Sequence, residues 1–243
     1  MTAVAAVRET RTGWRAYAVT LVITLSTALI GLAQLLHPAI LDTLQRDPDA
    51  LHSGQYWRLI TPILVQGAGW WQYGFNLVGS LVIGVSLEPY WGRMRWLLVY
   101  LAAGLAGVLG AYHWEPHGTG SGSSDAVAGL IGALMVAIWY GYRPRFPAYL
   151  YAAYFMAYLA VLDLTSLIPA MVVGSVSLSV SGRMWSLGKT GGLRILLTVL
   201  LLLGAPAMIL LHDNHGVGLV TGVVLGVLLP VRRNVSDRNW QTP

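Results

Sequence analysis

The sequence predicts an all-α protein, a polytopic bundle of transmembrane helices. Of its 243 residues, 56% are hydrophobic and only 10% are charged, and the mean hydropathy is +0.61. A soluble domain of this size needs more charge to cover its surface. Three apolar stretches without any charge approach the length that crosses about 30 Å of hydrocarbon, at residues 16–36, 195–211 and 216–231.

Basic clusters separate the predicted spans and indicate their direction. Placing every cluster in the cytoplasm satisfies the positive-inside rule and explains the net charge of +5 without a nucleic-acid partner. Thirteen of the fifteen Lys and Arg residues form these clusters: Arg8/Arg11/Arg15, Arg93/Arg95, Arg143/Arg145, Arg183/Lys189/Arg194 and Arg232/Arg233/Arg238. The chain then leaves the cytoplasm and returns three times, through 16–36 and 70–88, 96–112 and 124–142, and 195–211 and 216–231.

The first and the middle parts of the chain need separate treatment. The first span is too long for a signal-peptide core, so we expect a retained signal anchor. The apolar stretch from Arg145 to Arg183 has two cytoplasmic ends and therefore crosses an even number of times. We expect a hairpin with arms of about 15–17 residues that turns near Asp163 to Pro169; a re-entrant loop is the alternative.

These assignments define about eight membrane segments and one membrane domain. Residues 1–15 are the expected cytoplasmic N-terminus, 16–231 the transmembrane domain and 232–243 a cytoplasmic tail. The expected location is a cell membrane, with a bacterial plasma membrane favoured by the short N-terminus. The absence of cysteine excludes disulfides and thiolate chemistry.

Four polar residues lie near the outer ends of segments that all run inward: Gln72, Asn76, Ser124 and His215. Polar groups inside a membrane are costly, and the default interpretation is functional. Gln72 and Asn76 are four residues apart and share one helical face. Both amides are able to donate hydrogen bonds to an oxyanion; structural bonding between helices is the alternative.

Ser124 and His215 form a candidate nucleophile and base. Ser124 follows a glycine-rich run and begins an apolar segment, where a capping hydroxyl is the simpler interpretation. A helix N-terminus also presents free N–H groups that stabilise an oxyanion. A stripe of small residues beneath His215 and a matching one beneath Ser124 would let the two helices approach closely, bringing the base to the hydroxyl; the stripes include Gly218, Gly222, Gly129 and Gly132.

These residues resemble the rhomboid intramembrane serine proteases, from about Gln55 to Pro230. The Trp-Arg pair of the outer loop corresponds to Trp57-Arg58, and the end of the second helix to Leu87-Glu88 followed by Gly92. The Gly-x-Ser motif corresponds to Gly122-Ser-Ser124, with Gly129 and Gly132 in register, and the histidine helix to His215-Gly-Val-Gly218, followed by Gly222. The resemblance implies a six-helix core carrying the additional hairpin.

The resemblance implies a Ser–His dyad that cleaves peptide bonds in or beside transmembrane segments of protein substrates, without a cofactor. Ser124 would be the nucleophile and His215 the base, with Asn76 and Gln72 at the oxyanion. Three positions depart from the family pattern. Gln72 replaces a histidine; Asp125 replaces a glycine and either opposes a second negative charge or points to water; and Ala128 lacks an aromatic ring that would pack on the histidine.

Three other functions compete with proteolysis. A catalytically inactive rhomboid-like protein would bind transmembrane clients, and the three departures favour it. A zinc site would use outer-side His and carboxylate residues, but Pro116 interrupts the pair His113 and His117 and no His-Glu-x-x-His motif occurs, so we expect no metal. A transporter has little support, because few charges lie at mid-membrane. The sequence does not indicate an oligomeric state.

Overall fold

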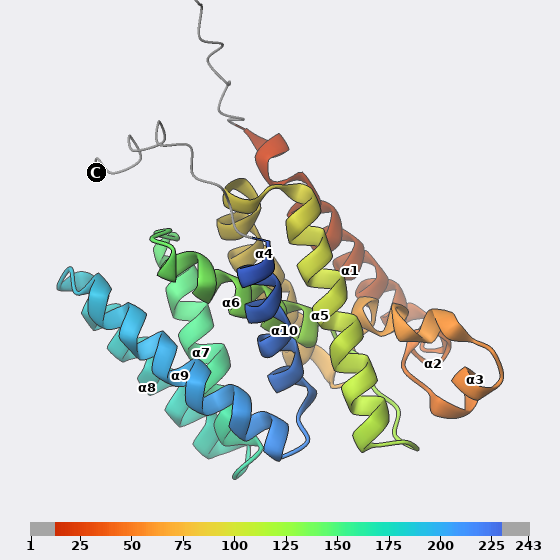
Figure 1. Ribbon diagram of the computed structural model, residues 1–243. Coiled ribbons are helices and arrows are strands. Elements are labelled where there is room, and N and C mark those ends of the chain that lie inside the picture. Colours follow the sequence, from red (N-terminus) through yellow and green to blue (C-terminus); the bar gives the residue numbers. More distant parts are fainter. Residues whose placement is uncertain (1–12, 230–243) are drawn as a thin grey trace, which may run out of the picture.

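The computed structural model describes residues 13–229, and within them the chain is a bundle of α-helices with no β-strand (Figure 1). The long helices lie roughly side by side, with α1 at one edge and α8 at the other. Their bounds are α1 Ala18–Leu36, α4 Gly69–Trp91, α5 Arg93–Trp114, α6 Ser124–Trp139, α7 Phe146–Leu162, α8 Leu167–Ser186, α9 Thr190–Leu210 and α10 Asn214–Leu228.

The eight long helices correspond to the eight predicted segments. Four helices are long and apolar enough to cross a membrane, Trp14–Leu36, Arg93–Trp114, Leu167–Ser186 and Thr190–Leu210. Three shorter apolar helices are α6, α7 and α10. The predicted segment 124–142 ends earlier, at Trp139, because a turn begins at Tyr140. The predicted segment 216–231 begins earlier, at Asn214.

The middle of the chain forms the predicted hairpin. Helices α7 and α8, 17 and 20 residues long, pack against each other and are joined by the turn 163–166. The second arm is longer than expected, and both arms are continuous helices. That both arms cross the membrane, rather than forming a re-entrant loop, stays a prediction. The expected tail, 232–243, and most of the expected N-terminus, 1–15, lie outside the described residues.

Helix α6 forms the centre of the bundle. Every side chain from Asp125 to Ile138 is buried, and α6 packs against α4, α5, α9 and α10. This helix contains small residues and aliphatic residues in almost equal measure, which lets neighbours approach on all sides. Helix α8 lies outermost, and most of its apolar residues are exposed on the outer surface of the bundle.

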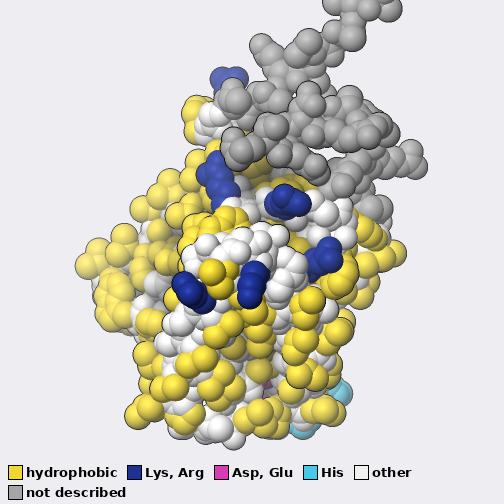
Figure 2. Space-filling view, turned by 90° about the vertical axis from the view of Figure 1, so that its left-hand side faces the viewer, with side chains coloured by type: hydrophobic (Ala, Val, Ile, Leu, Met, Phe, Trp, Pro, Cys, Tyr) yellow, Lys and Arg dark blue, Asp and Glu magenta, His cyan; other side chains and the backbone are white. Residues whose placement is uncertain are grey.

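The two ends of the bundle differ in charge. We call one end the basic end: there Arg93 donates to the carbonyl of Arg15, and Arg145 donates to the hydroxyl of Tyr17. Figure 2 shows Lys and Arg from the top to the middle of this face, with mainly hydrophobic surface below them and histidine near the lower edge. We call the other end the loop end. It carries the short helices α2 Ala39–Leu44 and α3 Pro48–His52 and the 115–123 loop.

Buried polar contacts of Arg46 hold the loop end in place. The side chain of Arg46, only 3% exposed, donates to the backbone carbonyl of Glu115 and pairs with its carboxylate at 3.4 Å. Arg46 and Gly120 also exchange backbone hydrogen bonds of 2.8 and 3.2 Å. These contacts fix the glycine-rich loop that leads into α6, because the guanidinium and the backbone hold it at several points.

Candidate active site

The four predicted site residues lie at the loop end of three neighbouring helices. Ser124 is the first residue of α6, His215 the second residue of α10, and Gln72 and Asn76 are the fourth and eighth residues of α4. Each of the three helices follows a loop at this end, and the side chain of Asp213 caps the first turn of α10. The predicted gathering of these residues at one end is therefore what the fold produces.

Helices α6 and α10 are in backbone contact. A Cβ built on Gly222 would lie 1.9 Å from the carbonyl oxygen of Gly129, and one on Gly218 would lie 2.5 Å from the carbonyl oxygen of Asp125. A Cβ on Gly132 would meet the α10 backbone at 2.2 Å. The contacts follow the same order along both helices, so α6 and α10 run parallel and only glycine fits between them.

Two adjacent serines begin α6, and burial distinguishes them. Ser123, the residue before the helix, is completely buried, whereas Ser124 is partly exposed. Solvent therefore reaches part of Ser124, whereas Ser123 is enclosed. Among the described residues no hydrogen bond joins the hydroxyl of Ser124 to His215, and such bonds often tighten only when substrate is bound.

His215 lies between two carboxylates. Its Nδ1 is 2.5 Å from Oδ1 of Asp213, and its Nε2 is 4.0 Å from Oδ1 of Asp125. The side chains of His215 and Asp213 are 19% and 9% exposed. Burial opposes ionisation of Asp213, but the adjacent imidazole outweighs it and lowers the pKa of this carboxyl. The carboxylate of Asp213 thus fixes the orientation of the imidazole ring through Nδ1, and Nε2 faces α6.

Asp125 is enclosed by its neighbours and does not point to water. Its side chain is 6% exposed, and its Oδ2 accepts a 2.7 Å hydrogen bond from Nδ2 of Asn214. Space for the carboxyl group comes from α5, where a Cβ on Gly107 would lie 2.3 Å from Cγ of Asp125. The expectation that this carboxylate points to water is therefore wrong.

An aromatic side chain supports the imidazole from an unexpected helix. Phe155 of α7 is completely buried, and its ring lies 6.0 Å from that of His215 at an interplanar angle of 77°. Such edge-to-face contacts orient rings. On α6 the position where the resemblance implies an aromatic residue is occupied by the buried Ala128, which faces Gly218 of α10, and the hairpin provides an aromatic contact from another direction.

Gln72 and Asn76 converge on the loop before Ser124. Nε2 of Gln72 donates to the carbonyl of Ser121 at 3.0 Å, and Nδ2 of Asn76 donates to Oε1 of Gln66 at 2.6 Å. A Cβ on Gly122 would lie 2.5 Å from Nε2 of Gln72 and 3.5 Å from Nδ2 of Asn76. Each amide carries a second N–H, so both remain able to donate to a ligand beside Gly122.

Comparison with known proteins identifies the family. A family model described as Rhomboid domain matches residues 53–182, more than half of the chain. This chain belongs to the rhomboid family. The match includes α4, α6 and most of the hairpin, and it ends before α10, so the position of His215 rests on the packing of this rhomboid rather than on the match.

Curated relatives are similar to parts of this rhomboid. "Rhomboid protease GluP" of Bacillus subtilis is 33% identical over 90 residues, which are 37% of this chain and 17% of that protein. "Putative rhomboid protease YdcA" of the same bacterium is 38% identical over 87 residues, 35% of this chain and 43% of that protein. "Rhomboid-type serine protease 2" of Emericella nidulans is 32% identical over 92 residues, 37% of this chain and 18% of that protein. The alignments span less than half the length of each of these relatives.

The remaining residues of the rhomboid motifs stabilise the two ends of the bundle through hydrogen bonds to the backbone. At the loop end, Nη1 of Arg58 donates to the carbonyls of Asp42 and Gln45 at 2.7 and 2.9 Å, and the indole of Trp57 donates to the carbonyl of Thr43. These bonds hold α2 against the bundle.

At the basic end the buried carboxylate of Glu88 accepts from the backbone N–H groups of Val19 and Thr20 at 3.0 and 2.8 Å. It thereby satisfies two free donors at the start of α1. Gly92, with φ of 84°, ends α4 directly after this contact.

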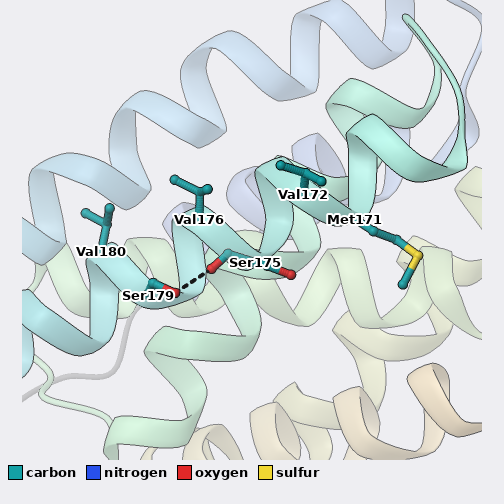
Figure 3. A pocket seen from close by; sticks show the side chains of 6 residues that line it. All are labelled: Met171, Val172, Ser175, Val176, Ser179 and Val180. Atoms are coloured by element: carbon teal, nitrogen blue, oxygen red, sulfur yellow. Dashed lines mark hydrogen bonds between the residues drawn. The ribbon is translucent and has the colours of Figure 1, made fainter.

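No group of metal-binding residues occurs within residues 13–229. Two of the outer-side residues weighed for a zinc site make other contacts: Glu115 pairs with Arg46, and His212 stacks on Trp114 with centroids 5.5 Å apart. A hollow on α8, drawn in Figure 3, lies on the exposed side of the hairpin. Its hydroxyl groups carry no chemistry for the site, because Ser179 donates to the carbonyl of Ser175 within the helix.

Asp213, Asn214 and Phe155 are site residues that sequence reasoning missed. One available signal was the spacing of Asp213 and His215, because an acid two residues before a histidine at a helix start is able to cap the helix and reach the ring. No sequence signal connects Phe155 to His215, because they belong to different helices and meet only through the packing of the hairpin.

Proposed function

We propose that this rhomboid is an intramembrane serine protease that cleaves peptide bonds in or beside transmembrane segments of its substrates. The observation that carries the proposal is the parallel backbone contact of α6 and α10. It sets the start of one helix beside the start of the other, with Nε2 of His215 4.0 Å from the residue that follows Ser124. Relatives named as proteases support the same activity.

The reaction begins with the hydroxyl of Ser124. His215 accepts its proton at Nε2 as the oxygen attacks the carbonyl carbon of the substrate, and returns that proton to the leaving amine. The developing oxyanion accepts hydrogen bonds from the backbone N–H of Ser124, which has no partner within the helix, and from the amides of Asn76 and Gln72. Water then releases the acyl group by the same steps, without a cofactor.

Helix lengths support a reaction site within the membrane thickness. At about 1.5 Å per residue, the 16 residues of α6 and the 15 of α10 span about 24 and 22 Å, whereas the 22 residues of α5 span about 33 Å. The hydrocarbon layer is about 30 Å thick, so α5 is long enough to cross it and α6 and α10 are shorter. At the loop end Asp125 lies beside Gly107, seven residues before α5 ends at Trp114, and Val217 lies beside Gly110, so α6 and α10 both start below the end of α5. A substrate segment must unwind locally to expose its carbonyl there.

The proposal is tested by cleavage of a model transmembrane substrate in liposomes and by labelling with a fluorophosphonate probe. Wild type cleaves and is labelled, whereas Ser124→Ala and His215→Ala do neither. Ser123→Ala and His212→Ala are matched controls, one residue and three residues away, and they retain activity. Cleavage that persists in Ser124→Ala contradicts the assigned nucleophile.

A second candidate function, client binding without cleavage, is favoured by one observation. The carboxylate of Asp125 faces Nε2 of His215, and no hydrogen bond to Ser124 forms among the described side chains. A binding protein would co-purify with transmembrane clients equally well in wild type and Ser124→Ala, and neither would react with the probe. Labelling of wild type at Ser124 alone contradicts this alternative.

We also propose that the basic end faces the cytoplasm. The chain has no cysteine, so a single introduced cysteine reports its own location. Ser53→Cys lies at the loop end and Ser186→Cys at the basic end, both exposed. A membrane-impermeant maleimide added to intact cells labels the first and not the second; the reverse pattern contradicts the orientation.

A further inference from the structure

We propose that Asp213 is a third member of the site, a positioning residue that holds His215 in the tautomer and orientation needed for proton transfer. This inference rests on the proposed function and changes the expected Ser–His dyad into a Ser–His–Asp arrangement. Asp213 would not contact the substrate and would act through the imidazole of His215.

The carboxylate of Asp213 contacts both the backbone and the side chain of His215. Its Oδ1 accepts from the backbone N–H of His215 at 2.9 Å and lies 2.5 Å from Nδ1 of the ring. The first contact caps α10. The second holds the proton on Nδ1, so that Nε2 is left with the lone pair that a general base requires.

The backbone around Asp213 fixes the position of this carboxylate. Its N–H donates to the carbonyl of Met208 at 2.8 Å, and its own carbonyl accepts from the N–H of Gly216 at 3.2 Å. The residue is thus hydrogen-bonded to the end of α9 on one side and to the first turn of α10 on the other. A carboxylate held by two helix ends orients the imidazole with little loss of side-chain entropy on each turnover.

Three carboxyl groups face His215, and they come from different elements. Asp213 lies in the α9–α10 loop, Asp125 on α6 and Asp163 at the end of α7. Asp163, which is exposed, lies near enough to Asp213 for the two carboxyl groups to interact. Partial desolvation and then the carboxylate of Asp213 raise the pKa of Asp163 to about 7. A neutral Asp163 therefore leaves Asp213 as the anion paired with Nδ1.

Two substitutions of Asp213 distinguish its capping of α10 from its contact with the imidazole ring of His215. Asp213→Asn and Asp213→Ser both keep a good N-cap for α10, while both remove the negative charge beside Nδ1. Asp49→Asn is the matched control, because Asp49 is exposed at the same end and does not contact the site. Thermal unfolding of each variant in detergent checks that the fold persists.

We expect Asp213→Asn and Asp213→Ser to reduce kcat about a hundredfold while KM changes less than about twofold. The acidic limb of the pH–rate profile, where His215 becomes protonated and stops acting as a base, moves to lower pH by about one unit or more, because the substitution removes an anion that raises the pKa of the imidazole. Asp49→Asn shows neither change. A kcat within about threefold of wild type with an unmoved pH profile overturns the proposal.

A second measurement keeps this inference separate from the proposed function. In ¹⁵N-histidine NMR spectra, His215 is assigned by loss of its signals in His215→Ala, and its titration is followed without any substrate. The midpoint falls in Asp213→Asn if the carboxylate acts on the ring; an unchanged midpoint overturns the inference. Lack of any Ser124-dependent cleavage or labelling in wild type instead overturns the proposed function.

Discussion

Adding one methyl group at Gly222 tests whether close helix contact creates the site. Gly222→Ala places a Cβ 1.9 Å from the carbonyl oxygen of Gly129, and 2.6 Å from the carbonyl carbon. Both are backbone atoms, so no side chain is able to rotate out of the way. Ordinary contact begins at 3.4 Å, which requires α6 and α10 to separate by about 1.5 Å at this level.

Both stability and catalysis respond to that separation. Overpacking of a closely packed interior costs about 1–3 kcal/mol. A misplacement of about 1 Å between reacting groups reduces the rate about a hundredfold. Gly222 lies two helical turns from His215, so we expect most of the separation to reach the pair formed with Ser124. Gly222→Ala therefore loses about a hundredfold in kcat while remaining folded at 25 °C.

The assay combines thermal unfolding in detergent micelles with cleavage of a transmembrane substrate in liposomes. Gly182→Ala is the matched control, because it adds the same methyl group to a helix at a position with no atom within 4 Å. The control retains activity and its Tm is unchanged or slightly higher. A Gly222→Ala variant with the Tm and kcat of wild type would refute the close contact of α6 and α10.

Three further predictions concern the neighbours of the site. Gly107→Ala lowers stability by about 1–3 kcal/mol because its Cβ meets the carboxyl group of Asp125; Asp125→Gly in the same chain restores Tm, and a failure to restore it contradicts the steric reason. Phe155→Leu, which removes the ring in edge-to-face contact with His215, slows fluorophosphonate labelling more than tenfold while Tm falls by only a few degrees; equal labelling contradicts the orienting contact. The raised pKa of Asp163 favours its protonated form in the folded protein, so the free energy of unfolding falls as pH rises from about 4 to about 7. Asp163→Asn removes this part of the pH dependence of Tm. An unchanged slope of Tm against pH in that variant contradicts the assignment to Asp163.

The fold followed from local features of the sequence. Hydrophobic stretches of membrane-crossing length predicted the helices, and the basic clusters predicted an even number of crossings between Arg145 and Arg183. The confirmed hairpin turns at 163–166, within the predicted interval. Both features depend on residues close together in the chain, because a helix must satisfy its own backbone hydrogen bonds in lipid. The cytoplasmic location of the basic clusters remains a prediction.

The small residues of α6 and α10 also predicted their contact. A stripe of glycines at four-residue spacing lies on one face of a helix, and such a face attracts another helix. The sequence therefore indicated which two surfaces meet and that Ser124 and His215 lie at the same end. The catalytic roles of these residues remain predictions, tested by the substitutions above.

By itself, then, the sequence determined the class of fold, the number of segments, and the gathering of Ser124, His215, Gln72 and Asn76 at one end of the bundle. Only the tertiary structure decided what surrounds the imidazole, a carboxylate at each nitrogen and the ring of Phe155 at its edge. The physical reason is that these contacts join residues on separate helices or loops. Their distances depend on the rotation and tilt of each helix, which the packing of the whole bundle sets.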